Sequence, residues 1–246
     1  MDQIREAIIS NAGMESRLES FRLKRLDRII TKPPFKFKSG IFVVLHIMPL
    51  VGATGGPVID VVNDRNSLLG DDLPGFFDGS ASINIDGCCW KSEGRTDVVD
   101  AYYQWFRNGC FEALWTIQPA SAIDDDPRIL PVYNELEYGE YIGRAVAFAL
   151  KSYSSCAVPP PYIVGVSLLN TVGWILGQAR NRPAYPHKSC KPVTDDRFDM
   201  VEITIENSGA DVPAAIRPIL TQIANAFGLL ESGNYKGPGW LGKPII

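Results

Sequence analysis

Side chains that could act as a nucleophile, a base or a metal ligand are few and widely spaced in this 246-residue chain. There are two histidines, His46 in the apolar run 41–50 and His187 in the basic, proline-rich stretch 180–192. Neither belongs to an H-x-x-x-H or H-x-E pattern and no G-x-S-x-G motif occurs, so neither a zinc nor a serine hydrolase is predicted. One enzymatic hypothesis stays open, in which an enzyme uses His46 with a loop carboxylate and the two groups share an accessible cavity.

The acidic residues gather in polar loops and not around either histidine. The runs 71–72, 124–126 and 195–196 lack EF-hand spacing, and such runs are typical of solvated charge and Asx turns. Glycines at 52–56 follow an apolar run as a phosphate loop would, but Pro57 comes next and no G-K-[ST] is present. We therefore expect no catalytic residues, no metal ligands and no cofactor.

Cysteine usage and hydropathy indicate a cytoplasmic protein without a membrane partner. No C-x-x-C pair occurs, so the cysteines are expected to be small buried hydrophobic residues in a reducing compartment. They are Cys88, Cys89, Cys110, Cys156 and Cys190. No apolar run approaches the roughly 20 residues that span a bilayer, and the N-terminus lacks the apolar core of a signal peptide.

The apolar patterns predict an α+β fold, with a mainly antiparallel sheet of about six strands and two or three packed helices. Expected helices cover 15–31, 135–154 and the segment after Asp211, and expected strands cover 41–50, 82–92 with a bulge at Gly87, the two arms of a hairpin over 101–117, 162–169 and 197–205. Three regions follow: a basic N-terminal helix or junction (1–38), a single α+β domain (39–230) and a flexible Gly- and Pro-rich tail (231–246).

The hairpin is the element that the sequence predicts most clearly, because two aromatic-rich runs, 102–106 and 110–115, meet at Asn108-Gly109. Asn-Gly tolerates the positive φ of a two-residue type I′ turn. The aromatic residues are either covered on both faces by the rest of the fold or open on one face, where they would form a ligand or partner surface. The candidate residues for that surface are Tyr103, Trp105, Arg107 and Trp115.

Charge is distributed unevenly along the chain. Residues 1–38 hold nine basic and five acidic side chains, which leaves a net charge of −8 on the remainder of a chain whose total is −4. The helix expected over 15–31 has an apolar stripe that includes Leu18 and Leu26, flanked by basic residues. These could bind nucleic-acid phosphates, or could form a solvated face or a linker. The candidate nucleic-acid-binding residues are Arg17, Arg22, Lys24, Arg25 and Arg28.

Four segments, 20–30, 43–50, 83–87 and 104–109, carry a resemblance to a bacterial family. Over most of 15–228 and in the same order, the chain resembles the C-terminal region found downstream of Alba-type (Schlafen-like) DNA-binding domains. In that family, nucleic-acid and nucleotide functions are ascribed to the preceding domain. The resemblance implies that the F-R-x-x-R-L-x-R-I helix, which runs here from Phe21 to Ile29, is the junction to such a domain.

The functional prediction is a non-enzymatic sensing or protein-interaction domain, accessory to a nucleic-acid-binding or ATPase module. Its partner would be another protein, or a preceding domain in a longer protein, and a homo-oligomer stays open. The alternative is a nucleic-acid-binding protein that uses the basic N-terminal helix.

Overall fold

The main structural unit is an eight-stranded antiparallel sheet. The computed structural model describes residues 2–69, 79–92, 97–118, 132–178, 185–186 and 190–245, without the side chains of 2–11, 132, 178, 185 and 186. Strand order is β10-β7-β1-β5-β4-β3-β2, with β11 also pairing with β7. The strands are β1 (Ile41–Pro49), β2 (Gly79–Ile83), β3 (Gly87–Ser92), β4 (Ala101–Phe106), β5 (Phe111–Ile117), β7 (Tyr162–Leu169), β10 (Arg197–Asp199) and β11 (Ile203–Ile205).

Smaller elements complete the fold. A three-stranded sheet consists of β6 (Val132–Asn134), β8 (Ile175–Gln178) and β9 (Tyr185–Pro186), and a hairpin consists of β12 (Tyr235–Lys236) and β13 (Gly239–Trp240). The helices are α1 (Asp2–Thr31), α2 (Arg65–Leu68), α3 (Glu135–Ser155) and α4 (Val212–Ala226), with a 3-10 turn η1 (Leu50–Thr54). Within the described residues, none of these helices is long and apolar enough to cross a membrane.

The predicted α+β class is confirmed, and the sheet has more strands than predicted because two segments each divide into two strands. The segment 82–92 is a hairpin, in which Asn84 and Gly87 close a loop between β2 and β3 and not a bulge. Residues 197–205 form β10 and β11, which pair with different parts of β7. The polar runs at 71–72 and 124–126 lie outside the described residues.

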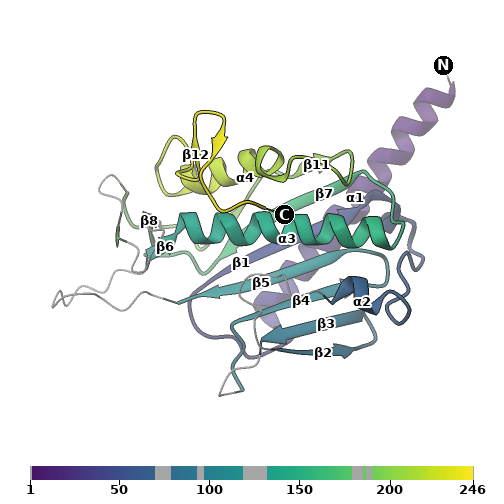
Figure 1. The fold of residues 1–246 in the computed structure, drawn as a ribbon, viewed down its shortest axis with the longest axis horizontal. Helices are drawn as coiled ribbons and strands as arrows, with labels where there is room; N and C mark the ends of the chain where they lie inside the picture. Colours follow the sequence, from purple (N-terminus) through teal and green to yellow (C-terminus); the bar gives the residue numbers. More distant parts are fainter. Residues whose placement is uncertain are drawn as a thin grey trace.

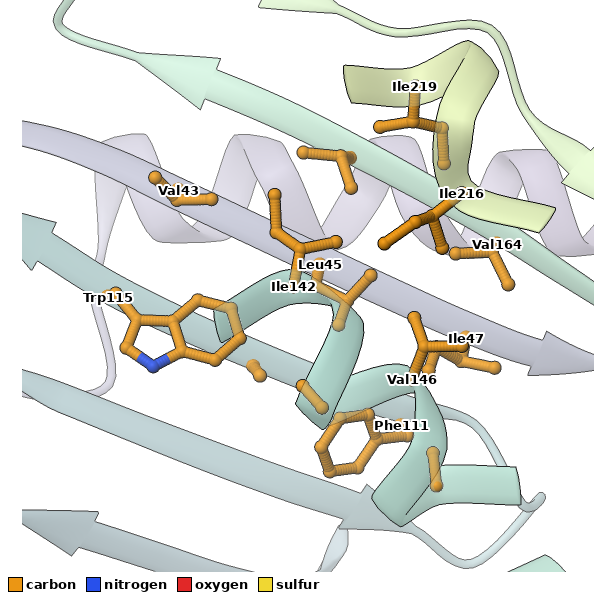
Figure 2. Close-up of a cluster of buried hydrophobic side chains, with 14 of the residues drawn as sticks. Val43, Leu45, Ile47, Phe111, Trp115, Ile142, Val146, Val164, Ile216 and Ile219 are labelled. Atoms are coloured by element: carbon orange, nitrogen blue, oxygen red, sulfur yellow. The ribbon is translucent and has the colours of Figure 1, made fainter. Parts of the chain in front are cut away.

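The sheet is covered on both faces (Figure 1). Helices α3 and α4 pack on one face, and Figure 2 shows Ile142 and Val146 of α3 over Leu45 and Ile47 of β1, with Ile216 of α4 beside Val164 of β7. Helix α1 crosses the opposite face, and its N-terminal turns extend beyond the sheet. This double cover explains why β1 is apolar at every position except His46.

Helix α4 follows the sequence prediction closely, because its start signal is local. The Asp211 side chain accepts a hydrogen bond from the Ala214 amide at 3.3 Å, as an N-cap residue does.

The tail at 231–245, which was predicted to be flexible, is hydrogen-bonded to α3. The Gly233 amide donates to Glu135 Oε1 at 2.7 Å and the Lys243 amide to Glu140 Oε1 at 2.9 Å, so the tail packs along α3.

The central hairpin exists, but its turn is not type I′. Residues 107–109 form a three-residue loop in which the Gly109 amide donates to Phe106 O at 2.9 Å. Gly109 has a φ of +84°, while Asn108 does not have positive φ. This is the geometry of a type I turn followed by a left-handed glycine, in which only one residue must have positive φ.

Candidate functional site

A row of polar residues crosses the face of the sheet beneath α1. Strand register places Gly165 of β7, His46 of β1, Glu112 of β5, Gln104 of β4 and Cys89 of β3 in direct succession on neighbouring strands. Apolar side chains close both ends of the row. One cluster contains Leu26, Ile29, Val44 and Leu114, and the other contains Leu18, Met48, Phe106 and Ile163. The polar row is therefore sealed between helix and sheet.

Glu112 is the centre of this row and is fully buried. Arg25 of α1 binds it with two hydrogen bonds, Nε to Oε2 at 3.0 Å and Nη2 to Oε1 at 2.7 Å. His46 Nε2 donates to Oε2 at 2.8 Å and the Tyr102 hydroxyl donates to Oε1. A carboxylate with four such donors needs no water to satisfy its lone pairs.

The charge state of Glu112 follows from these donors. Burial acts to raise the pKa of the Glu112 carboxyl, but hydrogen bonds and charge from His46 and Arg25 outweigh burial and lower the pKa to about 2. Burial likewise acts against the Arg25 cation, and Glu112 outweighs it, so the Arg25 pKa is raised. Burial raises the pKa of Tyr102. The site is thus an ion pair with a tyrosine donor.

Arg22 extends the polar row toward the sheet edge formed by β10. Its Nη2 donates to Ser167 Oγ at 2.7 Å, and its guanidinium lies 3.4 Å from both Asp199 and Glu202. A Cβ on Gly165 would lie 2.7 Å from Arg22 Nε, so only glycine at this position lets the arginine lie flat on β7. Arg22 and Arg25 together fasten α1 to two different strands.

A base, an acid and a phenol that converge in this way resemble an acid–base site, but the geometry does not let a substrate reach them. His46 and Glu112 are both fully buried, and Glu112 is already saturated by donors from inside the fold. General acid–base catalysis requires the proton donor or acceptor within hydrogen-bond reach of the substrate. The site can hold α1 in place, and its chemistry is that of a buried salt bridge.

The partner of His46 differs from the one expected. Sequence analysis paired this histidine with a loop carboxylate, whereas Glu112 lies within β5. One signal in the sequence could have identified it, because a lone acid in the apolar run Phe111–Ile117 requires a buried partner. The same holds for Arg22 and Arg25, which share the helical stripe of Leu18, Leu26 and Ile29.

The five predicted nucleic-acid-binding residues divide into two groups. Arg22 and Arg25 face the sheet and are committed to the pairs described above, so they are not surface residues. Arg17, Lys24 and Arg28 are exposed on α1. The helix was expected to expose all five, but its buried face includes two of them.

The predicted aromatic surface is also divided. Tyr103, Trp105 and Trp115 are buried in the core against α3, and the Trp105 indole nitrogen donates to Leu68 O at 2.9 Å. These three residues are therefore part of the core and not an open face. Arg107, at the hairpin loop, is the exposed member of the set.

Arg107 contacts a second exposed feature, the loop of Ile85 and Asp86 between β2 and β3. The Ile85 side chain is 90% exposed. Arg107 fixes the loop, because its Nε donates to Ile85 O at 3.2 Å and its amide donates to Asp86 O at 3.0 Å. Asn84 closes the loop with Gly87 and donates from Nδ2 to Gln104 Oε1 at 2.8 Å. The loop is thereby tied to the polar row.

The described chain is thus an α+β protein whose sheet has helices on both faces, with a buried ion-pair centre and a hydrogen-bonded surface loop that exposes Ile85. Comparisons with protein-family models, curated proteins and solved structures give no match. Among the residues in the described ranges, no group of three or more His, Cys, Asp or Glu is placed to hold a metal ion.

Proposed function

We propose that this chain is a non-enzymatic protein-interaction domain, and that the loop of Ile85 is its main contact with a partner. The observation that carries the proposal is a large apolar side chain held 90% exposed on a loop whose backbone is fixed. Exposed single apolar residues are common, but a rigid one loses little conformational entropy when it is buried by a partner. Interface anchors are side chains that fill a pocket on the partner, and Ile85 is held in a position to do so.

Charges around Ile85 support a partner of a particular chemistry. Arg107 is exposed beside the loop, and Arg28 of α1 lies 3.8 Å from Asp86 with about half of its side chain exposed. The surroundings are therefore apolar at the centre and mainly cationic at the rim. A protein with an apolar pocket bordered by acidic residues fits this surface.

The polar row supports the same proposal from inside the fold. The ionisable groups beneath α1 bind one another and are buried, so they do not contact a partner. The exposed loop of Ile85 is arranged to make such a contact. The family resemblance described for the sequence makes a nucleic-acid-binding or ATPase module the first partner to test. In that arrangement Arg22 and Arg25 hold α1 against the sheet, and α1 sets the orientation of the sheet relative to the joined module.

Site-specific photocrosslinking tests the proposal. A photoreactive amino acid is placed at Ile85 in one variant and at Leu230 in a control, because Leu230 is 91% exposed on another part of the surface. The protein crosslinked from position 85 is then purified, and its affinity is measured by calorimetry against the Ile85→Asp and Leu230→Asp variants. Burial of one isoleucine contributes about 1.5 to 3 kcal/mol, so we expect Ile85→Asp to weaken binding at least about tenfold.

The Leu230→Asp variant should bind as the unchanged protein does. Equal crosslinking from both positions, or equal loss of affinity in both variants, would refute the proposal. Turnover of a substrate by this domain would refute its non-enzymatic part.

A further inference from the structure

Four exposed basic side chains lie along α1 and at the residue that follows its last turn. Arg17, Lys24 and Arg28 are exposed, and helix geometry places them within an arc of about 40°. Lys32, the first residue after α1, is also exposed, and its amide donates to Arg28 O at 2.8 Å as in a further helical turn. We propose that these four side chains, called here the basic stripe, bind the phosphate backbone of a nucleic acid. The proposal rests on a different observation from the Ile85 interface, and Arg28 borders both surfaces.

The spacing of the stripe suits a polymer with a regular repeat of negative charge. Lys24, Arg28 and Lys32 succeed one another every four residues, which is about 6 Å of rise, and Arg17 precedes Lys24 by about 10.5 Å. One strand of a duplex advances about 3.4 Å per phosphate along its axis, so these intervals correspond to about two and three nucleotides. Three of these cations lie on one helix and the fourth directly follows its last turn, so all four can face one backbone at once.

Neighbouring residues extend the positive surface beyond the helix. Lys36 is exposed after the end of α1, and Lys91 of β3 lies with its Nζ 5.7 Å from the ring centre of Phe35. Asp27 of α1 is exposed directly before Arg28 in the sequence, and Asp86 of the neighbouring loop lies 3.8 Å from Arg28. Both side chains of that pair are about half exposed, and such a long surface pair is weak enough for a phosphate to compete with the carboxylate.

The arrangement favours nucleic acid over an anionic membrane. Leu23 and Ile30, the large exposed apolar residues of the described part of α1, lie about 120° and about 140° from Arg17 around the helix axis. A helix that lies on a membrane needs its apolar residues to insert between the lysines and arginines that face the lipid headgroups. The stripe offers cations without such an apolar complement.

The stripe differs from the basic set expected from the sequence. Arg22 and Arg25 do not belong to it, because Glu112, Asp199 and Glu202 neutralise them inside the fold. Lys32 joins it. The distinction has an experimental consequence, because replacing a stripe residue should alter binding without altering stability, whereas replacing Arg22 or Arg25 should alter stability first.

Fluorescence anisotropy with labelled dT20 and with a labelled 20-base-pair duplex tests the proposal, at 50, 100 and 200 mM NaCl. The test variant is Lys24→Glu/Lys32→Glu. The matched control is Lys151→Glu/Lys236→Glu, which changes net charge equally at exposed positions on α3 and β12. Thermal unfolding of both variants verifies that they fold. Anionic and neutral lipid vesicles are added in a parallel sedimentation assay.

Four phosphate contacts predict a slope of about −3 for log K against log salt on the single strand. The test variant should lose about 1.4 of that slope, since two contacts are removed, and at least about tenfold in affinity at 100 mM NaCl. The control should retain both slope and affinity within about twofold. A flat salt dependence, an equal loss in both variants, or sedimentation with anionic vesicles without binding to either nucleic acid would overturn the proposal.

Discussion

Arg25 and Glu112 form a two-point salt bridge between α1 and β5, joining residues that lie 87 positions apart in the chain. Both hydrogen bonds are made in a region closed by apolar clusters on either side. Taking two charges out of water costs several kcal/mol for each ion, and complete pairing is what offsets that cost. The pair therefore specifies where α1 lies more than it adds to stability, and this distinction can be tested.

Removing one partner of the pair should be strongly destabilising. Glu112→Gln leaves the Arg25 guanidinium buried without its counter-charge, and the expected loss is about 3 to 5 kcal/mol in the free energy of unfolding. Urea unfolding at pH 7 measures the change. Glu206→Gln, at an exposed carboxylate, is the control and should change stability by less than about 0.5 kcal/mol. A loss below about 1 kcal/mol at Glu112 would contradict the assignment.

Removing both charges together should be much less harmful than removing either one. We expect the double variant Arg25→Met/Glu112→Met to be more stable than the Arg25→Met and Glu112→Met single variants, because no unpaired charge is left in the interior. A double-mutant cycle measured by urea unfolding gives the coupling. Additive losses would show that the two side chains act separately.

Stability should fall in acid because of Glu112. Its folded-state pKa, about 2, lies below the ordinary value of 4.5, so its contribution is fully present above pH 4.5 and is lost as pH falls from 4.5 toward 2. The difference corresponds to about 3 kcal/mol. Unfolding free energies between pH 2 and 7 should therefore show a shallower dependence in Glu112→Gln than in the unchanged protein. Parallel profiles in the two proteins would speak against this origin.

Gly165→Ala should weaken the attachment of α1, because the added methyl would lie 2.7 Å from Arg22 Nε. Displacing the arginine disturbs its hydrogen bond with Ser167, and we expect a loss of about 1 to 3 kcal/mol. Thermal unfolding checks the change. Gly56→Ala is the control, since nothing lies within 4 Å of the added atom and its φ is not positive. That variant should be neutral or slightly more stable.

Local patterns alone predicted much of the fold. The two-faced apolar run of β1, the Asp211 N-cap of α4 and the apolar stripe of α3 are encoded within a few residues of one another, and the structure confirms all three elements. The Asn108-Gly109 hairpin was also predicted, although its turn type was wrong. Only Gly109 adopts positive φ, and sequence alone does not distinguish a two-residue loop from a three-residue loop at Asn-Gly.

The tertiary structure decided which charges are buried and which are exposed. Sequence determined that Arg22, Arg25 and Arg28 lie on one amphipathic helix and that His46 and Glu112 lie on apolar strands. It did not determine that β1 and β5 pair in the register that sets His46 opposite Glu112. That register depends on packing between segments 66 residues apart, and a shift by one residue would turn every side chain to the other face.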